Sequence, residues 1–116
     1  PPPPAKVLEA AAGLRYRAAV LLFIVASKPR VSADAWIFFP EAKYVFNRIS
    51  EQKAFSPEMI PPDRTVLTVD ISGDLDGDLW RMADKDLFER VMDGLEETVE
   101  DGLWPLPKYR EMLSLV

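Results

Sequence analysis

The sequence has neither cysteine nor histidine among its 116 residues. Without cysteine, the chain can form no disulfide, bind no metal through thiolates and use no cysteine nucleophile. Without histidine, it lacks the commonest zinc ligand and the commonest general base at neutral pH, and it cannot build a Ser-His-Asp triad. The lack of cysteine also suits a reducing compartment, so we expect a cytoplasmic protein.

A long hydrophobic run and a basic surface are also missing. The longest apolar run covers only residues 18–26, whereas a membrane-spanning helix needs about 20 residues. The 14 Lys and Arg residues against 19 Asp and Glu give a formal net charge of −5. An acidic chain lacks the basic face that nucleic-acid binding needs, and its scattered basic residues form no polybasic membrane patch. We therefore expect no membrane span and no nucleic-acid partner.

Proline marks the boundaries of the chain. The sequence opens with four prolines, so residues 1–5 are predicted to be an extended linker, either cut from a longer protein or left by processing or by a tag. Residues 6–116 are predicted to form one domain of common size. Residues 51–64 contain three further prolines and are predicted to be a loop, with one helical turn beginning at Ser56-Pro57.

Three stretches in the first half have the composition of β-strands. Residues 18–26 are rich in β-branched and aromatic residues, which favours a strand covered on both faces, although a buried helix would show the same periodicity. Two short apolar runs, at residues 36–39 and 44–50, flank a polar connection and predict a hairpin. The short connections favour antiparallel pairing of these three strands.

A fourth strand and a long helix follow. Alternating apolar residues over 65–71 predict a half-buried strand, and the apolar period becomes helical over 84–98. Shorter helices are predicted at residues 6–14 and 108–116. The fold class is therefore predicted to be α+β: an antiparallel sheet of about four strands, with a mixed sheet as the alternative, one long amphipathic helix packed on a face, and short flanking helices.

Motifs for metals and nucleotides fail on spacing. The acidic turn at residues 74–78 suggests a calcium loop, but no register places both the glycine and the glutamate that an EF-hand requires. The five glycines are isolated, so no glycine-rich phosphate loop is present. No pair of carboxylates is placed for glycosidase-type chemistry. We predict no catalytic, metal-binding or cofactor-binding residue in this chain.

Side chains of the hairpin are the candidates for ligand contact. Aromatic residues on both of its faces favour a sheet whose second face is covered by a partner. Arg48 could hold a carboxylate or phosphate through its fork of donors, whereas a surface arginine that covers apolar neighbours is the ordinary alternative. The predicted substrate-facing residues, as contacts and not as catalysts, are Trp36, Phe38, Phe46, Asn47 and Arg48.

Several phrases, in their order, resemble a known family. They are Leu14-Arg-Tyr-Arg17, Trp36-Ile-Phe-Phe-Pro-Glu41, Phe46-Asn-Arg-Ile-Ser-Glu51, Phe55-Ser-Pro-Glu-Met59 and Asp84-Lys-Asp-Leu87. From about Leu14 to Tyr109 the chain resembles the middle, substrate-binding region of FAD-dependent oxidoreductases of the amine oxidase and protoporphyrinogen oxidase-like superfamily, and more distantly UDP-galactopyranose mutase. It departs from the family's Tyr-Pro-x-Tyr pattern, since Trp104 takes the aromatic position and Leu106-Pro107 alters the spacing.

The resemblance implies a parent protein that uses FAD, held by a Rossmann-like domain on the same or a separate chain. The sheet of this chain would roof the pocket in front of the flavin, and the chain alone would be inactive. This hypothesis predicts an exposed apolar sheet face where the flavin domain docks.

Two other hypotheses predict different behaviour. A non-catalytic interaction module would form a stable homodimer through that face and would have no affinity for flavin. A small enzyme that uses carboxylates or a bound metal would show a pocket with converging acids whose pKa values are strongly shifted.

Overall fold

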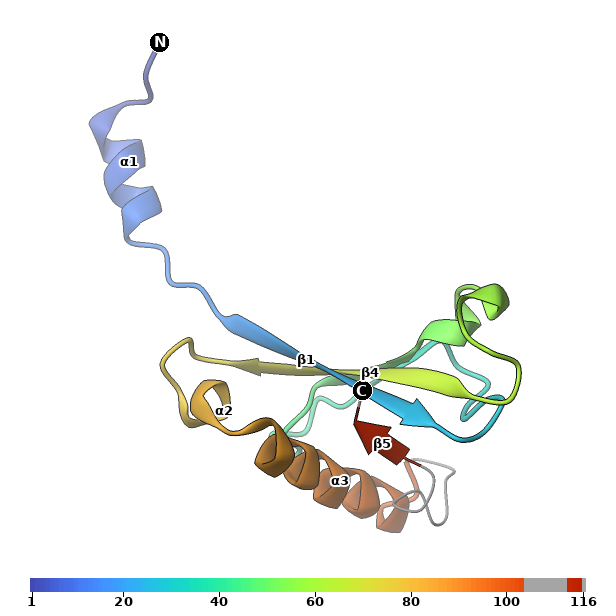
Figure 1. The fold of residues 1–116 in the computed structure, drawn as a ribbon. Helices are drawn as coiled ribbons and strands as arrows, with labels where there is room; N and C mark the ends of the chain where they lie inside the picture. The colour runs from blue at the N-terminus through green and yellow to red at the C-terminus, as the bar shows by residue number, and fades with distance from the viewer. Residues whose placement is uncertain (104–112, 116) are drawn as a thin grey trace.

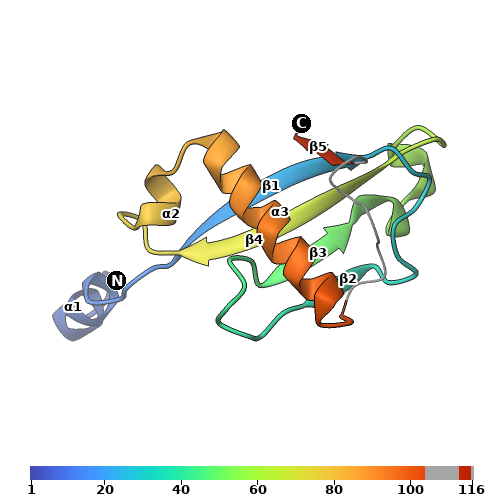
Figure 2. The same cartoon turned by 90° about the horizontal axis from the view of Figure 1, so that it is seen from below.

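The structure is a computed structural model that describes residues 1–103 and 113–115. The elements in chain order are α1 (Ala5–Ala12), β1 (Ala18–Ala26), β2 (Trp36–Phe38), β3 (Arg48–Glu51), two 3-10 turns (Gln52–Ala54 and Pro57–Met59), β4 (Thr65–Gly73), α2 (Asp78–Arg81), α3 (Asp84–Glu100) and β5 (Leu113–Leu115). Within the described residues, five strands form one antiparallel sheet in the order β2-β3-β4-β1-β5. The helix α3 lies across one face of this sheet (Figures 1 and 2), so the predicted α+β class is confirmed.

The order of the strands differs from the expectation that β1 would pair beside the hairpin. Instead, β1 pairs with β4 over nine residue pairs, from Ala18 opposite Gly73 to Ala26 opposite Thr65. The hairpin of β2 and β3 lies on the far side of β4. The two long strands can pair their backbone N–H and C=O groups along their whole length. With only three residues, β2 could pair with no more than a third of β1.

The hairpin is present, but its second strand starts four residues later than predicted. A strand from Tyr44 would place Tyr44, Phe46 and Arg48 on one face, because side chains alternate. In the structure, Tyr44 and Phe46 are instead buried together with Phe39, while Arg48 points to the opposite side of the sheet. The ring of Phe39 lies edge-on to Phe46, with centroids 5.1 Å apart. This aromatic cluster replaces the first half of the predicted strand with an irregular turn.

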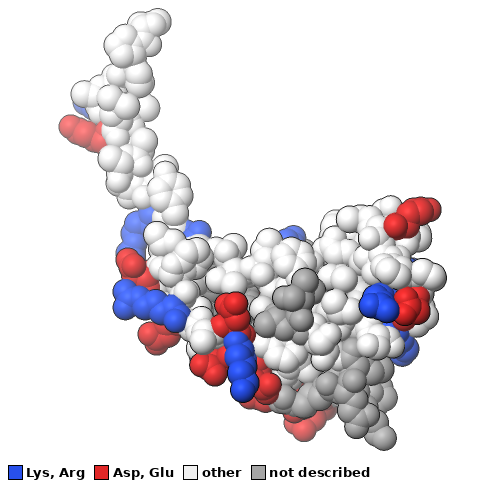
Figure 3. All heavy atoms as spheres, viewed as in Figure 1, with Lys and Arg blue, Asp and Glu red and all other residues white. Residues whose placement is uncertain are grey.

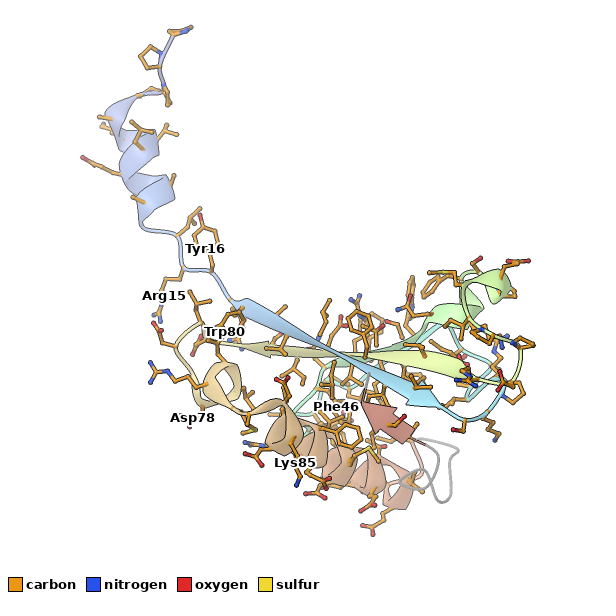
Figure 4. The ribbon with its side chains drawn as sticks, viewed as in Figure 1. Arg15, Tyr16, Phe46, Asp78, Trp80 and Lys85 are labelled. Carbon is orange, nitrogen blue, oxygen red and sulfur yellow. The ribbon has the colours of Figure 1, made fainter. Side chains whose placement is uncertain are left out.

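The core lies between the sheet and α3. The predicted helical row of Leu87, Val91 and Leu95 is buried. It shares one hydrophobic cluster with buried residues of β1 and β4, namely Leu22, Ile24, Leu67, Val69 and Ile71. Gly94 costs about 1 kcal/mol of helix propensity relative to alanine. The structure explains its presence, because a Cβ at this position would lie 2.9 Å from Cε1 of Phe46, which sits between the sheet and α3 (Figure 4).

The two ends of the chain differ from the predictions. Helix α1 begins at Ala5, one residue inside the predicted linker, and it projects away from the sheet with no buried residue (Figure 1). A helix of this length is marginal in water on its own. The predicted helix at 108–116 is wrong for Leu113–Leu115, which form β5 and pair with Ile24–Ala26; its other residues lie outside the described part.

A polar cluster ties the hairpin connection to the end of α3. Lys43 forms ion pairs with Asp101 and, at 3.2 Å, with Glu97. The hydroxyl of Tyr44 also donates a hydrogen bond to Asp101. Hydrogen bonds from Lys43 and Tyr44 hold the pKa of Asp101 below its usual 3.8, and the bond to Asp101 is the main reason why the pKa of Lys43 is raised.

These shifts predict how the cluster contributes to stability as pH changes. Because the pKa of Asp101 is lowered in the folded chain, its contribution is present above about pH 4 and is lost as pH falls through the folded value. The raised pKa of Lys43 leaves its contribution intact up to about pH 10. We expect the urea midpoint of Asp101→Asn to lie below that of the wild type near neutral pH, and the difference to shrink as pH falls below about 4.

The control is Asp63→Asn. The pKa of Asp63 is also lowered, chiefly by a hydrogen bond from Arg64. Arg64 is its neighbour in sequence and stays beside it in the unfolded chain, so this variant should show little such pH dependence. A difference between wild type and Asp101→Asn that is independent of pH would contradict the assignment.

Candidate ligand-binding face

The side of the sheet away from α3 carries a continuous set of side chains. Residues that pair across antiparallel strands share a face. One row across the sheet joins Trp36, Ser50, Thr68 and Phe23, and the next joins Phe38, Arg48, Asp70 and Leu21. We call these eight residues the open face. They come from β1, β2, β3 and β4, so the pairing of the long strands brings the hairpin and β1 onto one surface.

Half of the residues of the open face are large, apolar and exposed, and they surround buried polar side chains, namely Ser50, Thr68 and Asp70. Its four large apolar side chains, Leu21, Phe23, Trp36 and Phe38, are between 44% and 60% exposed. The exposed ring of Phe55, just after the first 3-10 turn, extends this surface with its centroid 5.6 Å from that of Trp36. In Figure 3, the upper side of the sheet is largely without charged side chains, which gather below it along α2 and α3. Apolar surface of this kind marks a site of interaction.

This exposure corrects the prediction that β1 is covered on both faces. Leu22 and Ile24 are buried under α3, but Leu21 and Phe23 on the other side meet solvent in the part of the chain that the structure describes. Every residue of β1 is apolar, so periodicity could not separate the two faces.

A charged pair lies in the middle of the open face. Arg48 forms an ion pair with Asp70, whose side chain is mostly buried, and its guanidinium lies 6.0 Å from the centre of the Phe38 ring. The Nε of Arg48 is buried and has no hydrogen-bond partner among the described residues. Asp70 therefore fixes the guanidinium against the sheet. A carboxylate or phosphate of a ligand would have to share Arg48 with Asp70.

The five predicted contact residues do not all meet. Trp36, Phe38 and Arg48 lie on the open face, and Asn47 lies at its border, where its side-chain oxygen accepts a hydrogen bond of 3.1 Å from the Ser72 hydroxyl. Phe46 is 2% exposed and belongs to the core under the sheet. The correction follows from the irregular turn before β3, which directs Phe46 toward Gly94.

Sequence reasoning missed six members of this surface: the small polar residues Ser50 and Thr68, and four others. Leu21 and Phe23 were hidden in a uniformly apolar strand, and Phe55 lies in a loop. Asp70 carried a usable signal, because a carboxylate inside an alternating apolar strand is costly unless a cation faces it. Arg48 was the strand cation nearest the hairpin's centre, so the pair could have been proposed from sequence.

The described residues show no arrangement suited to metal or phosphate chemistry. None of their Asp and Glu residues form a group of three or more that could hold a metal ion. A cavity of about 330 Å³ at the end of β4 is lined by Arg17 and Arg90, but also by Asp74 and Asp78. The two carboxylates offset the two guanidinium groups, so this cavity does not suit a diphosphate. None of the helices in the described ranges has the length and apolar character needed to cross a membrane.

Comparison of the chain with models of protein families, with curated proteins and with solved structures found no match. The geometry of the open face is thus the basis for assigning a function.

Proposed function

We propose that this chain is a substrate-binding domain of an FAD-dependent oxidoreductase of the amine oxidase and protoporphyrinogen oxidase-like kind. It acts with an FAD-binding domain, on the same or a separate chain, in the cytoplasm. The observation that carries the proposal is the open face: one side of the sheet packs on α3, and the other side exposes four large apolar side chains around buried polar residues of β3 and β4. A domain that forms one wall of a shared pocket needs such a surface.

The open face offers two kinds of contact to a substrate. Trp36 and Phe38 present flat aromatic surface, which suits an apolar or aromatic substrate group. Arg48, held by Asp70, offers a fixed cationic group beside them. These residues bind and orient; no group on this face is placed to act as a nucleophile or a general base.

FAD itself does not fit the residues of this chain. Its diphosphate requires a cradle of backbone N–H groups, usually a glycine-rich turn before a helix. The chain has no such motif, and the cavity with two arginines is offset by two carboxylates. The flavin is therefore proposed to bind to the partner domain, and the part of this chain is to bind and orient the substrate.

We expect the isolated 116-residue chain to bind no FAD stoichiometrically. A titration followed by flavin fluorescence, with sedimentation of the same samples, tests this. Tight binding by the chain alone would contradict the proposal, because a flavin site would then exist without a phosphate cradle. A stable dimer without flavin in the native protein would instead support the alternative of a self-associating, non-catalytic module.

The positive test places an affinity tag on the gene in the organism that encodes it. The native protein is isolated, and its flavin absorbance is measured per mole of chain. The wild type is expected to carry about one flavin, whereas Phe38→Glu loses it because a charge on the open face opposes docking. Leu75→Glu is the matched control: Leu75 is as exposed as Phe38, 58% against 60%, but lies in the turn after β4. Absence of flavin from the wild-type isolate would overturn the proposal.

A further inference from the structure

The loop between β3 and β4, residues 52–64, rises on the side of the sheet away from α3 (Figure 1). It contains two 3-10 turns and three prolines. Within the described residues, no side chain of this loop belongs to the hydrophobic cluster of the core. Two of its large apolar side chains, Phe55 and Met59, are 51% and 64% exposed. Packing against the core therefore does not fix the path of the loop.

Lys53 closes this loop at its base. Its Nζ donates hydrogen bonds to the backbone carbonyls of Pro61, Pro62 and Arg64, at 3.0, 3.1 and 2.9 Å. An ammonium group has three N–H donors, so all of them are used, and hydrogen bonds from a charged donor are stronger than neutral ones. Lys53 stands in the first 3-10 turn, whereas the three carbonyls lie just before β4. These bonds therefore join the two ends of the loop.

The first 3-10 turn also brings the loop to the open face. Phe55 follows the turn directly, and its ring centroid lies 5.6 Å from that of Trp36, with the ring planes tilted by 43°. Gln52, at the start of the turn, donates a hydrogen bond from Nε2 to the Oγ1 of Thr68, which is a member of the open face. The turn that carries Lys53 is thus the one that presents Phe55 to Trp36.

We propose that Lys53 is a positioning residue of the open face. It holds the loop so that the ring of Phe55 stays beside Trp36, and these two rings, which we call the rim, form an ordered apolar contact for the substrate. Lys53 acts through Phe55 and does not touch the substrate itself. This inference rests on the proposed function and extends its site from the strands to the loop.

Order in the loop is what Lys53 contributes to binding. A ligand that meets an ordered rim does not have to immobilise the loop on binding, so its affinity is higher. The contribution to global stability is small, because the three carbonyls can bond to water when the ammonium group is absent and no contact in the core is lost. Removing the ammonium group should therefore change the rim and leave the core unchanged.

NMR on the 116-residue chain tests the placement of Phe55. In the wild type, we expect nuclear Overhauser effects between the ring of Phe55 and the indole of Trp36. Lys53→Met keeps the aliphatic stem but removes the ammonium group. In this variant, we expect these effects to be lost, the order parameters of the loop amides to fall below about 0.6, and the urea midpoint to stay close to that of the wild type.

Arg64→Met is the matched control. It removes one positive charge from the same end of the loop, where the guanidinium of Arg64 pairs with its neighbour Asp63. Its backbone carbonyl, which accepts the hydrogen bond from Lys53, remains in place. The contact between Phe55 and Trp36 should therefore persist in this variant.

Binding of the dye Nile red measures the consequence for the open face. The dye is flat, apolar and uncharged, so the loss of a charge does not by itself change its affinity. We expect Lys53→Met to raise the Kd about threefold or more relative to the wild type and to Arg64→Met. Trp36→Ala should raise the Kd as well, which locates the dye at the rim. A variant that merely lost structure would bind more dye, because partly unfolded chains expose apolar surface.

The outcomes are distinct. Persistence of the contact between Phe55 and Trp36 in Lys53→Met would overturn the proposal, and so would an unchanged Kd, or a wild type that binds no dye. More dye bound together with a lower urea midpoint would make Lys53 a residue of general stability and would overturn its positioning role. The flavin content of the native protein is measured separately. The expected changes in Lys53→Met without native flavin would reject the proposed function alone.

Discussion

Replacing Phe46 by alanine is expected to lower the free energy of unfolding by about 3–5 kcal/mol. Its ring is 2% exposed and is surrounded by the rings of Phe39 and Tyr44 and by Gly94 of α3. Removing it leaves a cavity between the sheet and the helix, which neighbouring rigid rings cannot fill by moving. Urea unfolding of wild type and variant measures the change.

The matched control is Phe55→Ala. Phe55 is a phenylalanine of the same size but is 51% exposed beside the open face. Its removal should change the free energy of unfolding by no more than about 0.5–1 kcal/mol. Equal losses of unfolding free energy for the two variants would contradict the placement of Phe46 in the core. They would instead support the sequence-based prediction that Phe46 faces the substrate.

The contact between Phe46 and Gly94 allows a second test of the placement of Phe46 in the core. Gly94→Ala should gain about 1 kcal/mol of helix propensity, yet its Cβ would press on the Phe46 ring at 2.9 Å. We expect a net destabilisation of about 1–2 kcal/mol. In a Phe46→Leu background the pressure is relieved, so Gly94→Ala should become neutral or stabilising, and a double-mutant cycle measures that coupling.

The sequence predicted the elements that carry one clear periodicity. β4 alternates from Leu67 to Ile71, and α3 repeats its apolar residues every three or four positions, so both elements could be predicted. The prediction that β4 is half-buried is wrong, because Thr68 and Asp70 on its second side are buried as well. The order of the strands in the sheet could not be predicted from such periodicity. It depends on the matching lengths of β1 and β4, which lie 39 residues or more apart along the chain. Such a pairing is decided by tertiary packing and leaves no local pattern.

The open face was predicted in part for the same reason. Trp36, Phe38 and Arg48 stood out because they are large or charged residues in a short hairpin. Phe46 was assigned with them because a regular strand was assumed, and the aromatic cluster with Phe39 breaks that regularity. Leu21 gave no signal, since only the register of β1 against β4 places it beside Asp70.

Glu51→Ala is expected to cost about 3 kcal/mol of stability. The carboxylate of Glu51 is buried and accepts hydrogen bonds from the backbone N–H groups of Val31 and Ser32, at 3.0 and 2.9 Å. Its own N–H donates to the carbonyl of Ala35 at 2.9 Å. Removal of the side chain leaves the N–H of buried Val31 without a partner. Glu51→Gln keeps one acceptor oxygen but turns an amide donor toward a second donor, so its cost should be intermediate.

The control is Glu58→Ala. The exposed carboxylate of Glu58 accepts a 3.1 Å hydrogen bond from the Ser56 hydroxyl. Its removal should change the free energy of unfolding by less than about 0.5 kcal/mol. A loss of unfolding free energy for Glu51→Ala no larger than that of the control would show that the hydrogen bonds from Val31 and Ser32 do not anchor the segment before β2.

Because this segment leads directly into Trp36, the same substitution should also speed the exchange of the β2 amides relative to those of β4. The buried carboxylate thus connects the core to the open face: it fixes the entry of the edge strand whose aromatic side chains form the proposed wall of the pocket.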